Sequence, residues 1–323
     1  MQGEQGPRFD VLGTTRAVVD QAAHVRIDRG RVEEAAARLA REGAVPPPWN
    51  RRYHYSGDPD STAQYVLILD TLNFCFWGEP RWRVAYNGEV LDGYWALAAA
   101  LTRAIREGTA PLLDARYLAR MPREDLEEVL RGEGVIPLLN ARWRNLREVG
   151  RILADDYGGR FVHVIEEAGG SAVALAALLA ARFPSFRDVA VYRGREVHFL
   201  KRAQICASDL YGTFEGRGYG AFHDAGRLTA FADYKLPQIL REWGILVYDE
   251  ALAARVDARL PIDAGSEEEV EIRACTVWAV ETLRDALADR GVSLTAAELD
   301  WVLWERSQGM QARPYHRTRT IFY

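Results

Sequence analysis

Helical periodicity runs through most of the chain and constrains the fold more than any other feature. Apolar residues recur at the three- and four-residue spacings of a helix, and the periodic segments begin and end at typical helix signals. One segment starts at Asp92, which can cap a helix, and ends at Gly108. We predict helices over residues 92–108, 122–132, 140–159, 171–183, 200–214, 236–244, 267–291 and 295–309.

One local pattern predicts strands. Short alternating runs flank Asn87 and Gly88 in the stretch RWRVAYNGEVLDG. An Asn-Gly pair between such runs is the strongest sequence signal for a two-residue β-hairpin. We therefore expect a small β-hairpin near residues 81–92, attached to a helical body.

The chain reads as a single domain. No internal repeat, low-complexity tract or long flexible linker divides it, although AVPPPWN at 44–50 marks a stiff turn. We predict a mainly α fold with one domain over 1–323. Its N-terminal helical subregion covers 1–60, and a body over 61–323 carries the motifs described below.

Composition argues against several classes of partner. The longest apolar stretch, 171–183, is too short to span a bilayer, and the first ten residues lack the pattern of a signal peptide. The net charge of −5 offers no broad basic face for a nucleic-acid backbone. We expect a cytoplasmic protein with no membrane association and no stable nucleic-acid partner.

Cofactor and nucleophile motifs are missing from the sequence. The six histidines show no metal-ligand spacing, and no G-x-S-x-G elbow is present. The three cysteines lie far apart in apolar segments, as buried thiols do. The alternating glycines of 214–222 match neither a dinucleotide fingerprint nor a P-loop, so an interhelix loop is favoured. We predict no metal and no organic cofactor.

Aromatic residues are the unusual part of the composition, with nine Trp, fourteen Tyr and eleven Phe. They are dense in DTLNFCFWGEP, where Phe74 and Trp77 stand beside Asn73 and Asp70. Large apolar rings are usually buried for packing. A pocket for a flat heterocycle, however, needs a stacking face with hydrogen-bonding groups in its plane, and this stretch offers both.

Charged residues in three other segments have both a structural and a functional interpretation. Lys201 and Arg202 open an otherwise apolar helix, where solvated charge is the default. Asp233, in LTAFADYKLPQILREWG, can be a helix cap or a catalytic carboxylate. The C-terminal RPYHRTRTIFY ends in apolar residues, which suggests that it docks and offers forked donors suited to a phosphate, namely Arg313, His316, Arg317 and Arg319.

Several of these segments, in this order, resemble one known family. They are DTLNFCFW, DGYWALAAALTRAIREG, FLKRAQICASDL, LTAFADYKLPQIL, EVEIRACTVWAVE, LDWVLWE and PYHRTRTIFY. Together they resemble the queuosine salvage family, the queuosine 5'-phosphate N-glycosylase/hydrolases, from about residue 60 to the end. The resemblance implies hydrolysis of the N-glycosidic bond of queuosine 5'-monophosphate, with release of queuine for reinsertion into tRNA. It also implies a cofactor-independent reaction and a helical fold similar to helix-hairpin-helix DNA glycosylases.

Within that reaction the residues take candidate roles. Breaking a ribosyl C–N bond builds positive charge on the sugar, so a carboxylate beneath C1' is needed, and Asp233 is the candidate. Lys201 is its candidate partner. The expected substrate-binding residues are Asp70, Asn73, Phe74, Trp77, His198, Phe199, Arg202, Asp209, Phe231, Tyr234, Lys235, Gln238, Asp300, Trp301, Trp304, His316, Arg317 and Arg319.

Two alternatives stay open on sequence grounds. The protein could be a nucleic-acid base glycosylase that acts on a flipped base, although the acidic net charge counts against it. It could also be a queuine-binding protein without turnover, which would not need a carboxylate under the sugar.

Overall fold

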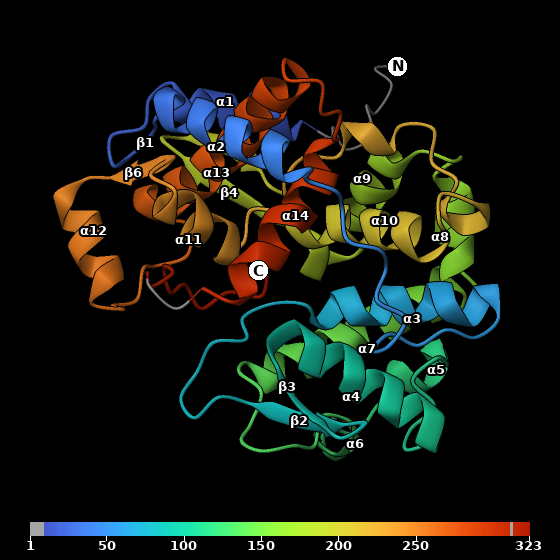
Figure 1. Cartoon of the computed structure of the whole chain (residues 1–323). Coiled ribbons are helices and arrows are strands. Elements are labelled where there is room, and N and C mark those ends of the chain that lie inside the picture. Colours follow the sequence, from blue (N-terminus) through green and yellow to red (C-terminus); the bar gives the residue numbers. More distant parts are fainter. Residues whose placement is uncertain (1–9, 311–312) are drawn as a thin grey trace.

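The structure is a computed structural model that describes residues 10–310 and 313–323 (Figure 1). Its helices are α1 Val11–Val19, α2 Arg29–Glu42, α3 Pro59–Leu72, α4 Gly93–Glu107, α5 Ala115–Leu118, α6 Arg123–Val129, α7 Leu139–Asp156, α8 Phe161–Glu167, α9 Ala172–Arg182, α10 Lys201–Thr213, α11 Lys235–Glu242, α12 Glu250–Asp257, α13 Glu267–Ala288 and α14 Ala296–Gln308. The strands are β1 Val25–Ile27, β2 Arg83–Tyr86, β3 Glu89–Asp92, β4 Val189–Tyr192, β5 Arg195–His198 and β6 Leu246–Tyr248. The mainly α fold predicted from the sequence is confirmed.

Helix ends explain why the periodic segments stop where they do. Gly108 closes α4 in a left-handed conformation, with φ of 67°, which a side chain would strain. Asp92 occupies the position before α4, but its side chain makes no capping hydrogen bond. It pairs instead with Arg81 at 3.0 Å, so Asp92 stands at the N-cap position of α4 but does not cap the helix through its side chain.

The predicted hairpin is confirmed as the antiparallel pair β2–β3. Its turn residues Asn87 and Gly88 both have positive φ, at 48° and 80°, as a tight two-residue turn requires. A second hairpin, β4–β5, turns through Arg193 and Gly194 with similar angles. The sequence does not indicate this hairpin, because Arg is an uncommon residue in this conformation.

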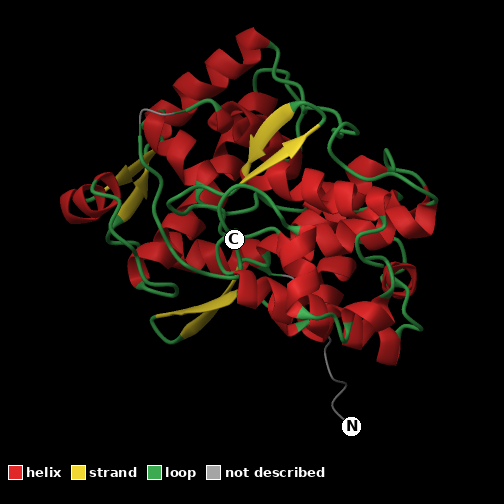
Figure 2. Cartoon of the chain, turned by 90° about the horizontal axis from the view of Figure 1, so that it is seen from below, coloured by secondary structure: helices red, strands yellow, loops and turns green. Residues whose placement is uncertain are grey.

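The third strand pair, β1–β6, joins segments far apart in the chain, with Val25 opposite Tyr248. Figure 2 shows the three separate strand pairs set among the helices. In the described part of the chain each sheet has two strands, so helix packing builds the body. None of the described helices combines the length and apolar composition needed to cross a bilayer.

Two large apolar cores organise the molecule. The larger lies among α3 to α10, and its buried side chains include Leu67, Leu101 and Phe161. The other joins α2, α11, α13 and α14, with Leu39 and Leu283 among its buried side chains. In Figure 1 these groups form opposite parts of the body. The N-terminal helices α1 and α2 both pack on α13. Helix α2 belongs to the second core, whereas Val11 and Val18 of α1 form a smaller cluster with another part of α13.

The C-terminal segment crosses between the two groups of helices and is docked. The backbone N–H of Cys75 donates to the carbonyl of Tyr323 at 2.8 Å, and that of Ile262 donates to Arg317 at the same distance. The Tyr323 hydroxyl donates to Glu269 Oε1 at 2.7 Å. The expectation that this segment docks is confirmed.

Candidate functional site

A cavity of about 810 Å³ lies where the two groups of helices meet the C-terminal segment. This volume falls in the range of sites that enclose a small organic ligand. Of the twenty residues expected to be catalytic or to bind the substrate, fourteen line it: Asn73, Phe74, Trp77, Lys201, Asp209, Phe231, Asp233, Tyr234, Lys235, Gln238, Asp300, Trp301, Trp304 and Arg317.

Asp233 both caps a helix and faces the cavity. Its Oδ1 accepts hydrogen bonds from the backbone N–H groups of Lys235 at 2.7 Å and Leu236 at 2.9 Å, at the start of α11. Among the described residues no donor reaches Oδ2 within hydrogen-bond distance, and the residue is 8% exposed. Burial raises the pKa of this carboxyl, while Lys201 and the two N–H groups oppose the rise.

Lys201 stands at the first position of α10, where a cation is unfavourable to the helix dipole. Leu200 precedes it with φ of 51° and turns the chain from β5 into the helix. The ammonium Nζ donates to the Asn73 carbonyl at 3.3 Å. Burial lowers the pKa of Lys201, whereas Asp233 and Asp70 favour its charged form.

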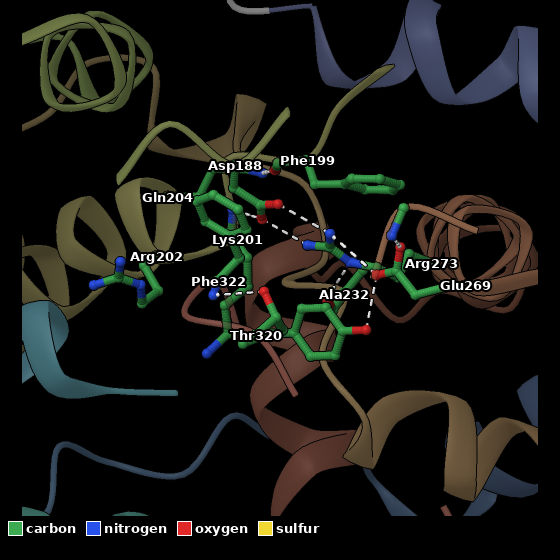
Figure 3. A network of polar contacts seen from close by, with 12 residues as sticks. Asp188, Phe199, Lys201, Arg202, Gln204, Ala232, Glu269, Arg273, Thr320 and Phe322 are labelled. Atoms are coloured by element: carbon green, nitrogen blue, oxygen red, sulfur yellow. Dashed lines mark hydrogen bonds and ion pairs between the residues drawn. The ribbon is translucent and has the colours of Figure 1, made fainter. Parts of the chain in front are cut away.

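A buried ionic network contacts the backbone of Lys201 and of Ala232, the residue before Asp233 (Figure 3). Asp188 binds Arg273 with both oxygens, at 2.9 and 2.6 Å, and its Oδ2 also accepts the backbone N–H of Lys201 at 3.0 Å. Arg273 Nε donates to the carbonyl of Ala232, the neighbour of Asp233, at 3.1 Å. The network therefore holds the backbone at Lys201 and at Ala232, the residue before Asp233.

Three further carboxyl groups surround the inner end of the cavity. Asp209 and Asp300 line it, and Asp70 lies directly behind Asn73, whose Nδ2 donates to Asp70 Oδ1 at 3.4 Å. Burial raises the pKa of Asp70 to about 7 and those of Asp209 and Asp300 well above their usual range. Asp300 Oδ2 accepts the N–H of Phe231 at 2.7 Å, whereas Oδ2 of Asp70 and of Asp209 are buried without a partner among the described residues.

Aromatic rings form the walls. Trp304 on α14 meets Tyr94 and Trp95 on α4 edge-on, with ring centroids 5.6 Å apart in both pairs. Trp301, one helical turn before Trp304, also lines the cavity. Phe74 also lines the cavity, but it is 1% exposed and packs against guanidinium groups, with that of Arg142 at 4.2 Å from its ring.

Several residues that line the cavity are not indicated by the sequence, among them Trp49, Asn50, His54, Tyr94 and Trp95. Trp49 and Asn50 end the proline-rich turn, and His54 follows it closely. Tyr94 and Trp95 stand at the start of a helix that was predicted from the sequence, but without a role in a binding site. Aromatic residues beside a stiff turn were the available signal, but nothing local indicates which cavity they face.

Cationic groups lie along one side of the cavity. Arg317 lines it, with its guanidinium 5.6 Å from the centre of the Trp77 ring. Lys235 Nζ donates to Gln238 Oε1 and to the Ser307 carbonyl, both at 3.0 Å. Arg81, Arg259 and Arg313 also line this side; within the described residues, Arg259 and Arg317 have no carboxylate partner at salt-bridge distance.

Two of the expected binding residues pack behind the cavity on its α10 side. Arg202 is 1% exposed and donates to the backbone carbonyls of Asp70 at 2.9 Å and Thr71 at 2.8 Å. In Figure 3 it points away from the ionic network. Phe199 lies under the guanidinium of Arg273, at 3.9 Å. Neither lines the cavity.

The remaining expected residues also lie outside the cavity lining. His198 ends β5, and its backbone N–H donates to Thr14 Oγ1 at 3.0 Å. His316 is buried beside Tyr323, and burial lowers the pKa of its imidazole to about 3. Arg319 is exposed, with its guanidinium 5.0 Å from the Trp77 ring.

One group of side chains has the spacing of a metal site, away from the cavity. Ligand atoms of His24, Glu267 and Glu271 lie within 4.8 Å of one another. Glu271, however, already accepts the backbone N–H groups of 23–25 and the hydroxyl of Tyr192. Its role is to join the chain after α1 to α13.

The geometry defines a class of protein. A cavity with aromatic walls, an acidic inner end and a cationic side suits a flat heterocycle with N–H donors that is joined to an anionic group. A buried carboxylate, Asp233, and a buried lysine, Lys201, both line it and influence each other electrostatically, as in enzymes that stabilise a cationic transition state.

Comparison with known proteins identifies the family. Residues 53–323 match the family model described as queuosine salvage protein. A protein of Sphaerobacter thermophilus, named queuosine 5'-phosphate N-glycosylase/hydrolase, is 56% identical over 99% of both chains. A protein with the same name from Mus musculus is 35% identical over 98% of this chain and 100% of its own. Another, from Schizosaccharomyces pombe, is 34% identical over 85% of this chain and 86% of its own. The chain belongs to the queuosine salvage protein family.

Proposed function

We propose that this protein hydrolyses the N-glycosidic bond of queuosine 5'-monophosphate and releases queuine for salvage into tRNA. The observation that carries the proposal is that Asp233 and Lys201 are both buried, line the same cavity and influence each other electrostatically. The two residues stand in a chain that is 56% identical to a relative named for this reaction.

Asp233 stabilises the charge that bond cleavage creates. As the C–N bond breaks, the sugar becomes an oxocarbenium-like cation, and a carboxylate below C1' lowers the free energy of that state. The second oxygen of Asp233, which no described donor reaches, is the atom offered to C1'. Water then completes the hydrolysis, either directly or after a glycosyl ester has formed.

Lys201 keeps that carboxylate ionised. Burial alone would favour the neutral acid, and the nearby ammonium opposes this effect. The demand on Asp233 is high because queuine is a 7-deazapurine: the ring position that many nucleoside hydrolases protonate is a carbon. With weak activation of the leaving group, stabilisation of the sugar cation must supply more of the rate.

The cavity walls provide the remaining recognition. The base stacks against Trp301 and Trp304, and its N–H donors and amine-bearing arm meet the acidic end. The 5'-phosphate lies on the cationic side, near Arg317 and Lys235, where forked and flexible donors are both present.

The direct test is release of the free base. The protein is incubated with queuosine 5'-monophosphate, with the nucleoside and with queuosine-containing tRNA, each with and without a chelator. We expect queuine from the monophosphate, unaffected by the chelator. Release from intact tRNA alone would indicate a nucleic-acid glycosylase, and tight queuine binding without release from any substrate would indicate a binding protein.

A further inference from the structure

Trp77 lies in the loop that follows α3, and the sequence groups it with Phe74 as a stacking face for the base. Its neighbours in the structure favour a different role. Trp77 is 7% exposed and belongs to a small buried cluster against which Tyr315 and Ile321 pack. Both of these residues belong to the C-terminal segment, so the ring lies on the side of the cavity that this segment forms.

The tryptophans assigned to the base have other neighbours. Trp301 packs against the larger core and meets Trp49, with ring centroids 6.3 Å apart. Trp304 packs against the core of α2, α11, α13 and α14 and meets Tyr94 and Trp95. Trp77 lines the same cavity but belongs to neither core. The aromatic lining therefore has two separate parts.

Two arginines of the C-terminal segment lie over the Trp77 ring. The guanidinium of Arg317 is 5.6 Å from the ring centre and that of Arg319 is 5.0 Å from it. A cation within about 6 Å of a ring centre is attracted by the negative face of the ring. This attraction needs no hydrogen-bond acceptor. Within residues 10–310 and 313–323, indeed, neither guanidinium has a hydrogen-bond partner or a carboxylate at salt-bridge distance.

The charge at this ring is not neutralised by the protein. Arg81 and Arg313, which line the same side of the cavity, each pair with a carboxylate, at 3.0 and 3.3 Å. Glu79 lines this side too, but it lies at salt-bridge distance from none of the described cations. Two unpaired guanidinium groups at one ring repel each other, so an anion beside Arg317 is favourable there.

The loop that carries Trp77 is firmly held. The backbone N–H of Cys75 donates to the carbonyl of Tyr323 at 2.8 Å, and its carbonyl accepts from the buried Arg142 at 3.0 Å. Arg317, by contrast, has a long side chain that is only half-buried. A fixed ring under a flexible cation reduces the conformational entropy that the cation loses when it binds a ligand.

We propose that Trp77 is a positioning residue that holds Arg317 at the cationic side of the cavity and thereby sets the preference for a phosphorylated over an unphosphorylated substrate. Trp77 acts on the phosphate end of the ligand, and the base is left to Trp301 and Trp304. The inference rests on the proposed function, in which the 5'-phosphate lies near Arg317.

The test compares Trp77→Leu with Trp304→Leu on queuosine 5'-monophosphate and on the nucleoside, together with calorimetric binding of queuine. Trp77→Leu should lower kcat/KM for the monophosphate by about three- to tenfold, as expected for loss of a partly buried cation–π contact. It should change the nucleoside and queuine values little. Trp304→Leu should weaken queuine and affect both substrates. Equal losses of queuine affinity in the two variants would place Trp77 in the base wall and overturn the proposal.

A double variant tests whether Trp77 acts through Arg317. If it does, the two losses are not additive. Trp77→Leu combined with Arg317→Gln should then prefer the monophosphate over the nucleoside as weakly as Arg317→Gln alone, and no more weakly. A further loss of preference, equal to that caused by Trp77→Leu in the native chain, would refute the positioning role.

A conservative variant separates positioning from folding. Trp77→Phe keeps a ring face for the guanidinium and should recover most of the preference lost in Trp77→Leu. Melting temperatures of both variants are measured beside the rates. If Trp77→Leu does not fold, the smaller loss in Trp77→Phe must itself disappear in the Arg317→Gln background. An undiminished loss there would contradict the proposal.

The same two compounds distinguish this inference from the proposed function. If the protein released no queuine, the proposed function would fail, and calorimetric binding of the monophosphate and the nucleoside would replace the rates. Trp77→Leu should then weaken binding of the monophosphate by about the same factor and that of the nucleoside hardly at all. Equal weakening of both compounds would overturn the inference.

Discussion

Two buried clusters of charged residues meet at Lys201, and they differ in how well their polar atoms are satisfied. In the ionic network, Arg273 binds both oxygens of Asp188 and the carbonyl of Ala232, and Glu269 accepts the Tyr323 hydroxyl at 2.7 Å. Around the cavity, by contrast, Asp209 in its lining and Asp70 behind Asn73 each keep one buried oxygen without a partner among the described residues.

The difference distinguishes a structural cluster from a functional one. A buried ion pair with every donor and acceptor engaged has nothing left for a ligand, and it can only hold the fold. The cavity concentrates Asp70, Asp209, Asp233 and Asp300 around the ammonium of Lys201, so several carboxyl groups must stay neutral or await a donor. Such unsatisfied polarity is costly without a bound ligand, which is why it indicates a site.

The largest effect should come from breaking the satisfied cluster. Arg273→Met leaves Asp188 and Glu269 buried without their cation, and we expect a loss of about 3–5 kcal/mol in the free energy of unfolding. Arg241→Met is the matched control, because Arg241 also binds an aspartate with two bonds, at 2.7 and 2.9 Å, but that partner, Asp257, is half exposed. Chemical denaturation of both variants measures the contrast, and equal losses would contradict it.

Removing the negative charge of Asp233, in the cluster around the cavity, should lower kcat and leave the stability of the fold nearly unchanged. Asp233→Asn keeps the hydrogen bonds to α11, since Asn caps nearly as well as Asp, but it removes the negative charge. We expect kcat to fall by at least ~10²-fold with little change in melting temperature. Asp58→Asn, at the exposed cap of α3, should leave kcat unchanged. Near-normal turnover by folded Asp233→Asn would exclude the assigned role.

The two clusters were not equally visible in the sequence. Asp233 and Lys201 stand in segments whose motifs carry the family resemblance, so the sequence alone suggests their candidate roles. The helices were likewise predictable, because their periodicity and end signals are local. Glu269 and Arg273 also stand in one of these segments, EVEIRACTVWAVE, one helical turn apart, but the sequence does not assign them a role. Their partner Asp188 is distant in sequence, and only the packed fold brings it to Arg273.

Part of the cavity also depends on contacts that no local pattern encodes. The β1–β6 pairing joins residues 25–27 to 246–248, and it ties the N-terminal region to the helices beyond the cavity. His54 and Tyr94 meet across the cavity wall from separate segments, with no shared motif. Conversely, Arg202 looked like a ligand-binding cation, but its donors bond to the carbonyls of Asp70 and Thr71.

An intermediate effect should follow from replacing a wall residue. Trp304→Leu removes a ring that meets Tyr94 and Trp95, and a stacked base typically contributes about 1–3 kcal/mol to binding. Queuine affinity should fall by a corresponding amount. Trp278→Leu, a half-buried tryptophan bonded to Thr15 outside the cavity, is expected to lower the melting temperature without changing affinity. Normal queuine binding by Trp304→Leu would mean that the Trp304 ring only packs against Tyr94 and Trp95 and does not contact the base.

The smallest effect is expected from a substitution on the cationic side of the cavity, where an arginine lies without a carboxylate partner among the described residues. Arg317 lines the cavity and has no carboxylate partner among the described residues, whereas Arg319, two positions later, is exposed and does not line it. If Arg317 holds the phosphate, binding at that remote group helps to keep C1' against Asp233, and its loss lowers kcat/KM for the monophosphate.

Arg317→Gln should therefore reduce kcat/KM for queuosine 5'-monophosphate by about tenfold and affect the unphosphorylated nucleoside far less, so that the two rates converge. Arg319→Gln is the control and should alter both substrates only slightly. The four rates are compared at one fixed salt concentration, because charge interactions at an open site are screened by ions. An equal proportional loss on both substrates in Arg317→Gln would show that Arg317 supports the fold through its contact with Trp77, and the phosphate would then be sought at Lys235 and Arg259.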